Sequence, residues 1–110
     1  GCTFKENVPD IRNSRVFELV KALEGYSIKV QLSDPLADHE ETFEKTGIPL
    51  TPFDHLTATS AVILAVPHEM YLKKEWALAD LLKNSSGIFF DLKAKLPREN
   101  VPEKVTLWRL

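Results

Sequence analysis

The sequence predicts an α/β fold: a three-layer, Rossmann-like open parallel sheet of about five strands. Segments of strand character alternate with segments of helical character along the chain, and this alternation is typical of a parallel sheet with helices on both faces. The stretch from Ser60 to Val66 is a continuous apolar run, as expected for a central strand that is buried on both faces. Right-handed crossovers leave few topologies, of which we favour the strand order 3-2-1-4-5.

The first strand is predicted at Cys2–Phe4, and the first helix from about Ser14 to Glu24. Apolar residues recur in this helix at the spacing of one helical face: they are Val16, Leu19, Val20 and Leu23. Ser14 is the expected N-cap, and Gly25 is expected to adopt the left-handed conformation that ends many helices.

A second strand, a short helix and an edge strand are predicted next. Apolar and polar side chains alternate over residues 28–32, which is the pattern of a strand. Asp38 followed by Glu41 indicates the start of a short helix that Gly47 ends. Residues 48–50 are predicted as a short edge strand, since a proline in the middle would remove a hydrogen bond from a central one.

The second half of the chain begins with the apolar strand at residues 60–66, which is predicted to lie beside the first strand. A helix is expected from about Lys73 to Lys83, with an inner face formed by Trp76, Leu78, Ala79 and Leu82. Residues 87–92 are predicted as the next buried strand. The proline-spaced tail closes with a short apolar stretch at residues 105–110, to which we assign no strand.

Composition limits the class of function. The 110 residues are expected to form a single domain, and its formal charge of -2 gives no basic excess to bind nucleic acid. One cysteine excludes an internal disulfide and a cysteine-based zinc site, and three scattered histidines do not predict a metal site. No segment predicts a membrane span or a signal peptide, so we expect a reducing, cytoplasmic compartment. The start at Gly1, without a methionine, suggests a domain excised from a larger protein.

Basic side chains are predicted to converge at one edge of the sheet. Lys5, His68 and Lys93 follow the carboxyl ends of predicted strands, and Arg12 lies nearby. Ligands bind at this edge of open parallel sheets, so the pattern favours an anionic ligand. An ion pair between Asp10 and Arg12 that only fixes the loop is an equally good interpretation of Arg12.

Two familiar chemistries are not predicted within this chain. A dinucleotide site needs a glycine-rich turn after the first strand, but residues 4–10 contain no glycine. Cys2 lies in an apolar strand and is expected to be an inert core residue instead of a nucleophile. Trp76 and Phe17 lie on apolar helix faces and are expected to belong to the core.

The segment from Thr3 to Arg15 resembles the start of the C-terminal domain of the UDP-glucose/GDP-mannose dehydrogenase family. The shared pattern is Phe4-Lys5, a short spacer, Asp10-x-Arg12-x-Ser14 and then a helix. Similar motifs follow in the same order along nearly the whole chain: Val30 to Pro35, the strand Ala61 to Val66 followed by His68, and Phe90-Asp91-x-Lys93. The final Leu107-Trp108-Arg109-Leu110 resembles the branch that acts on UDP-N-acetylhexosamines.

The resemblance implies that the chain binds the UDP-sugar substrate of a nucleotide-sugar 6-dehydrogenase. Such enzymes oxidise the sugar C6 hydroxyl to a carboxylate with two NAD, and their catalytic cysteine lies outside this domain, so no catalytic residue is expected here. Lys5 and Lys93 would bind the substrate, although many relatives have an arginine at the second position and lysine lacks its planar fork. Arg12 would reach toward NAD. The implied partners are an N-terminal NAD-binding domain and a central dimerisation domain of the same protein, which would form a homo-oligomer.

Two other functions are compatible with an α/β domain of this size. A receiver-like signalling module would need clustered acidic residues at its first and third strand ends, whereas the first strand here is followed by Lys5. A structural module that only mediates assembly would show no response to UDP. The residues alone predict an anion-binding α/β domain, and only the resemblance predicts the dehydrogenase.

Overall fold

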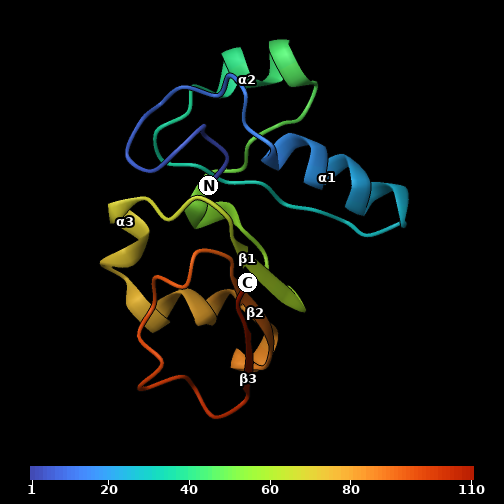
Figure 1. Ribbon diagram of the computed structural model, residues 1–110. Helices are drawn as coiled ribbons and strands as arrows, with labels where there is room; N and C mark the ends of the chain where they lie inside the picture. The colour runs from blue at the N-terminus through green and yellow to red at the C-terminus, as the bar shows by residue number, and fades with distance from the viewer. The chain divides into compact units, whose positions relative to one another are not determined.

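A parallel sheet forms around the apolar run at residues 61–64. The computed structural model describes residues 1–110, and the chain divides into two units, residues 1–56 and residues 57–110, which we describe separately. Figure 1 labels the helices and strands of both units. No helix combines the length and the apolar character that crossing a membrane requires.

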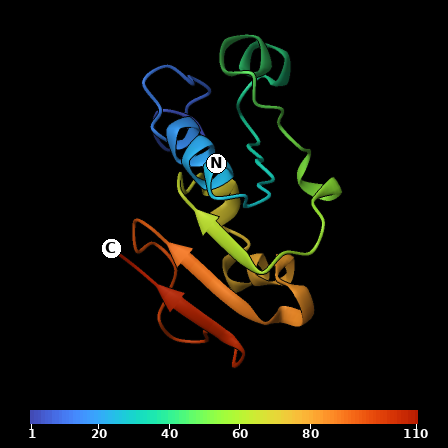
Figure 2. The ribbon, with the colours of Figure 1, turned by 90° about the vertical axis from the view of Figure 1, so that its right-hand side faces the viewer.

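The second unit contains a three-stranded parallel sheet. Its strands are β1 (Ala61–Leu64), β2 (Gly87–Asp91) and β3 (Val105–Trp108), in the order β1-β2-β3. Ala61 lies opposite Ile88, and Gly87 lies opposite Val105. Figure 2 shows the three strands side by side and pointing the same way. The parallel pairing of the two apolar strands is therefore confirmed, and β3 is a strand that the sequence reading missed.

The two faces of this sheet differ in burial. Leu64, Phe89 and Val105 point to one face and are 4%, 0% and 9% exposed. The indole ring of Trp76 packs edge-on against Phe89, with ring centroids 5.3 Å apart. The opposite face carries Ile88 and Trp108, which are 38% and 57% exposed. The sheet thus has one core face and one partly open face.

The helix predicted at residues 73–83 is replaced by shorter pieces. They are the 3₁₀ helices Glu75–Leu81 and Lys83–Ser85, which follow the short helix α3 (Glu69–Leu72). Glu75 has a φ of 46°, which a continuous right-handed helix does not allow. The predicted inner residues are nevertheless buried: Trp76, Leu78, Ala79 and Leu82. The apolar spacing therefore identified the core correctly, whereas the helix type was wrong.

The first unit is built from α1 (Val16–Gly25), α2 (His39–Thr46) and the 3₁₀ helix Phe53–His55. Its buried core comprises Cys2, Ile11, Phe17, Val20, Leu32, Ala37, Ile48 and Leu50. Both ends of α2 are as predicted: Asp38 Oδ1 accepts a hydrogen bond from the Glu41 N–H at 2.8 Å, and Gly47 has a φ of 72°. The burial of Cys2 and Phe17 is also confirmed.

Helix α1 differs from its prediction at both ends. The helix begins at Val16, and its N-cap residue is Arg15 instead of Ser14. Ser14 lies one residue earlier, and its Oγ accepts a hydrogen bond from the Val16 N–H at 3.3 Å. Gly25 lies inside the last turn, and the left-handed residue is Ser27, with a φ of 63°. The helix therefore ends one residue later than predicted, and the left-handed residue follows two residues after the predicted glycine.

The prediction of five strands in the order 3-2-1-4-5 is wrong for this structure. Residues 2–4, 28–32 and 48–50 form no strand. Their backbone groups bond elsewhere: the Phe4 N–H donates to the Asp10 carbonyl at 2.7 Å, and the Thr51 N–H donates to the Leu32 carbonyl at 2.7 Å. A strand needs a neighbour that takes its backbone hydrogen bonds, and an alternation of apolar and polar residues does not specify one.

Candidate functional site

The loop that carries Lys5 is closed by its own backbone. The Phe4 N–H donates to the Asp10 carbonyl at 2.7 Å, and Thr3 Oγ1 donates to the Lys5 carbonyl at 2.9 Å. Thr3 is buried, whereas Lys5 is exposed. This arrangement anchors the backbone of Lys5 and leaves its ammonium group at the surface, where it can neutralise an anion.

Arg12 and Asp10 form a forked ion pair at the other end of this loop. Arg12 Nη2 lies 2.9 Å from Asp10 Oδ2, and Arg12 Nε lies 3.0 Å from Asp10 Oδ1. The Arg12 backbone N–H also donates to Oδ1 at 2.8 Å. These hydrogen bonds lower the pKa of Asp10 to about 2. The predicted ion pair between Asp10 and Arg12 is therefore present in the structure.

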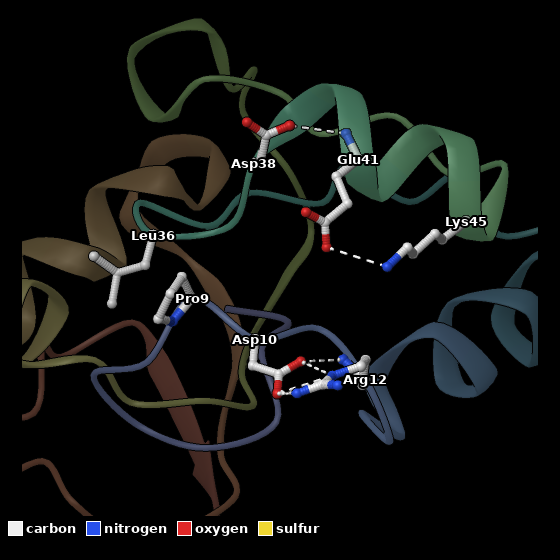
Figure 3. A pocket seen from close by; sticks show the side chains of 7 residues that line it. All are labelled: Pro9, Asp10, Arg12, Leu36, Asp38, Glu41 and Lys45. Carbon is white, nitrogen blue, oxygen red and sulfur yellow. Dashed lines mark hydrogen bonds and ion pairs between the residues drawn. The ribbon is translucent and has the colours of Figure 1, made fainter.

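A pocket of about 390 Å³ lies beside this ion pair (Figure 3). Pro9 and Leu36 contribute apolar surface, and the charged lining residues are Asp10, Arg12, Asp38, Glu41 and Lys45. The charged groups bond to one another or to nearby backbone: Lys45 Nζ lies 3.6 Å from Glu41 Oε1, and Asp38 caps α2. Three carboxylates against two cations make the pocket unsuited to a free polyanion.

Asp34 is a buried carboxylate whose hydrogen bonds to backbone N–H groups were not predicted from the sequence. Its side chain accepts hydrogen bonds from the backbone N–H groups of Cys2 at 2.7 Å, Leu36 at 2.8 Å and Ala37 at 2.9 Å. Asp34 thereby ties the start of the chain to the turn that follows residues 28–32. The signal in the sequence was the Asp34-Pro35 pair, because an aspartate in a turn accepts hydrogen bonds from the backbone N–H groups that follow it.

His68 follows β1 but is fully buried. Its backbone N–H donates to the Val66 carbonyl at 2.9 Å, and its carbonyl accepts from Tyr71 and Leu72 at the start of α3. Its ring lies 5.9 Å from the Tyr71 ring. The sequence placed His68 among basic groups that face a ligand, whereas the structure encloses its ring in the second unit.

Lys93 lies in a turn that follows β2 directly. Asp91, the last residue of β2, is fully buried and accepts from the Lys95 N–H at 3.1 Å and the Leu96 N–H at 2.9 Å. The Ala94 N–H donates to the Asp91 carbonyl at 3.1 Å, and Ala94 has a φ of 52°. Lys93 itself is exposed, so the turn presents a cation at the carboxyl end of the sheet.

Arg109, just beyond β3, reaches the same turn. Its Nη2 lies 3.3 Å from Asp91 Oδ2 and donates a hydrogen bond to the Leu96 carbonyl. Arg109 also lines a surface pocket of about 340 Å³ together with Arg98, Leu107 and Trp108. The sequence reading noted Arg109 only as part of a terminal motif, because no local pattern reveals a partner 18 residues away.

The structure thus places the three predicted site residues in two settings. Lys5 and Arg12 share one loop of the first unit, and Lys93 lies in a turn of the second unit. All three are exposed. Their roles toward UDP-sugar and NAD remain predictions.

The fold and the site define the class of the protein as an α/β domain suited to an anionic ligand. The sheet is open and parallel, and a basic side chain follows the carboxyl end of one of its strands. The chain belongs to the UDP-glucose/GDP-mannose dehydrogenase family, because the sequence profile of that family's UDP binding domain matches residues 1–98. The resemblance stated from the sequence is confirmed, and the chain is the C-terminal, UDP-binding domain of the family.

Curated relatives agree with this family. The chain is 34% identical over 110 residues, all of its length, to "Protein CapL" of Staphylococcus aureus. It is 39% identical over 103 residues to a UDP-N-acetyl-D-glucosamine 6-dehydrogenase of Salmonella typhi and 32% identical over 99 residues to one of Pseudomonas aeruginosa, with 90% of the chain covered in each case. It spans 26%, 23% and 24% of these three relatives, about a quarter of their length.

Proposed function

We propose that this chain is the UDP-sugar-binding domain of an NAD-dependent nucleotide-sugar 6-dehydrogenase that oxidises the C6 hydroxyl of the sugar to a carboxylate with two NAD. The observation that carries the proposal is the match of residues 1–98 to the UDP binding domain of the dehydrogenase family. Two relatives named UDP-N-acetyl-D-glucosamine 6-dehydrogenase support it. The sugar is thus proposed to be of the UDP-N-acetylhexosamine type.

Within this domain, Lys5 and Lys93 are proposed to bind the UDP-sugar. Both are exposed cations on anchored backbone: the loop of Lys5 is closed by the Phe4–Asp10 hydrogen bond, and the turn of Lys93 is held by Asp91. An ammonium group of this kind forms charge-assisted hydrogen bonds with phosphate oxygens. No residue of this chain is assigned a catalytic role.

The residues present do not fit the pyrophosphate of NAD. The loop over residues 4–10 has no glycine, and the first turn of α1 carries Glu18 and has no side-chain cap. A glycine-rich turn that lets the backbone approach the pyrophosphate is therefore lacking. We propose that NAD is held by an N-terminal domain of the full-length protein, and that Arg12, whose side chain is 75% exposed, reaches toward it.

The three-layer arrangement and the partners belong to the same proposal. A second layer of helices would cover the face of the sheet on which Ile88 and Trp108 are exposed. The proposed partners are the N-terminal NAD domain and the central dimerisation domain of the same protein, in a homo-oligomer. The proposed site of action is the cytoplasm, where NAD and UDP-sugars are available.

The test is calorimetric titration of the full-length protein with UDP, together with NADH production from UDP-N-acetylglucosamine. Lys5→Ala is expected to weaken UDP binding roughly ten- to hundredfold, because one charge-assisted hydrogen bond is lost. Lys29→Ala removes an exposed cation that has no proposed role and is the control. The proposal is wrong if the wild type binds no UDP, and the site assignment is wrong if both variants bind UDP equally well.

A further inference from the structure

Lys93 lies in a turn whose backbone is fixed from several sides. The Leu92 N–H donates to the Leu64 carbonyl of β1 at 3.4 Å, and the Ala94 N–H donates to the Asp91 carbonyl at 3.1 Å. The next residues bond to the Asp91 carboxylate. Beyond them, the Pro97 carbonyl accepts from Trp76 Nε1 at 2.8 Å. The position of Lys93 therefore depends on how firmly the Asp91 carboxylate is held.

The Asp91 carboxylate is fully buried, and a buried charge is stable only when it is paired and hydrogen-bonded. Arg109 is the cation beside it: its side chain is only 15% exposed, and its Nη2 lies 3.3 Å from Asp91 Oδ2. The same Nη2 donates to the Leu96 carbonyl, while the Leu96 N–H donates to Asp91 Oδ2 at 2.9 Å. Asp91, Leu96 and Arg109 thus form a closed group that joins β2, the turn and the end of β3.

From this geometry we infer that Arg109 is a positioning residue for Lys93, so that a residue just beyond β3 controls the affinity for UDP. The inference rests on the proposed role of Lys93 in binding UDP. Removing the guanidinium leaves the Asp91 charge buried without its cation and frees the Leu96 carbonyl. The turn then rearranges, and Lys93 no longer lies where the UDP-sugar needs it.

The experiment is a double-mutant cycle on the full-length protein, with the dissociation constant of UDP measured by calorimetry. Lys93→Ala is expected to weaken UDP binding at least about tenfold, and Arg109→Ala about three- to tenfold. In the double variant, Arg109→Ala is expected to add less than about twofold, because a positioning residue has no effect when the residue that it positions is missing. A purely structural role would weaken UDP binding equally in both backgrounds, and that result would overturn the inference.

Arg98→Ala is the matched control, because Arg98 lines the same pocket as Arg109 but no hydrogen bond joins it to Asp91 or Leu96. Its UDP affinity is expected to stay within about twofold of the wild type, and its melting temperature and NAD affinity should stay unchanged. An equal loss of UDP affinity in Arg98→Ala and Arg109→Ala would show that the loss of either positive charge weakens UDP binding, whatever its hydrogen bonds. That result would contradict the inference.

Arg109→Lys covers the case in which Arg109→Ala does not fold. It keeps the charge beside Asp91 but cannot also hold the Leu96 carbonyl with a planar fork, so UDP should bind about two- to fivefold more weakly. Wild-type affinity in Arg109→Lys would contradict the inference. If Lys93→Ala binds UDP like the wild type, the proposed role of Lys93 fails and the inference fails with it. If Lys93→Ala is weakened and Arg109→Ala is not, only the inference fails.

Discussion

Asp34 accepts a hydrogen bond from the backbone N–H of Cys2 at 2.7 Å, across 32 residues of sequence. The other oxygen of the same carboxylate accepts from Leu36 and Ala37. One buried side chain therefore joins the beginning of the chain to the core of the first unit. This relationship explains why an acidic residue, 4% exposed, is stable among apolar neighbours.

Asp34→Ala is expected to destabilise the chain by at least about 3 kcal/mol, because three backbone N–H groups lose their acceptor. Asp34→Asn keeps one amide oxygen as an acceptor, so it should cost less, about 1–2 kcal/mol. Urea unfolding of both variants measures the two free energies. Equal stability of Asp34→Ala and the wild type would show that the three hydrogen bonds contribute nothing.

Cys2 is expected to resist thiol reagents in the folded chain. Burial, and secondarily the negative charge of Asp34, raise the pKa of the Cys2 thiol to about 12. The thiolate is the reactive form, and its population stays small between pH 7 and 9. A disulfide reagent monitored by absorbance should react slowly with the native chain at pH 8 and rapidly in urea. Rapid labelling of the native chain would contradict the buried position of Cys2.

Cys2 also predicts a pH dependence of stability. The pKa of the thiol is raised in the folded state, so the unfolded chain loses its proton first as the pH rises. The free energy of unfolding should therefore decrease from about pH 9 toward pH 12. Cys2→Ala, which has no titrating thiol, should show a smaller decrease over the same range in urea unfolding. Identical slopes for the two chains would refute this linkage.

The pKa of Asp10 provides a test of its ion pair with Arg12. The side-chain and backbone hydrogen bonds from Arg12 lower this pKa to about 2. The ion pair is therefore intact above about pH 4, the pKa of an aspartate in the unfolded chain, and is lost as the pH falls through 2. Arg12→Ala should raise the carboxyl pKa toward its ordinary value in an NMR titration. Arg15→Ala, which removes an exposed arginine three residues away, should not change it.

Gly87→Ala is expected to disrupt the junction between β1 and β2. A Cβ at this position would lie 2.4 Å from the Ser60 carbonyl oxygen, and Gly87 has a φ of 146°, so the variant should lose about 2–4 kcal/mol of stability. Gly25→Ala is the matched control, because nothing lies within 4 Å of a Cβ there and alanine is the better helix former by up to about 1 kcal/mol. Thermal unfolding should therefore move in opposite directions for the two variants.

The sequence by itself determined the features that neighbouring residues decide. Asp38 and Gly47 define the ends of α2 because an N-cap side chain and a left-handed residue act within one turn. The apolar spacing around Trp76 and Leu82 identified buried residues correctly, because burial follows the side-chain pattern. The motif from Phe4 to Ser14 indicated the family that the comparison of residues 1–98 then showed.

Only the tertiary structure decided where backbone hydrogen bonds go and which distant side chains meet. Residues 28–32 have the alternation of a strand but form no ladder, since a ladder depends on a neighbour that no local pattern specifies. The contact between Asp91 and Arg109 is likewise invisible in the sequence, because 18 residues separate the two charges. It exists because β2 and β3 lie side by side and in parallel, which brings their carboxyl ends to the same edge of the sheet.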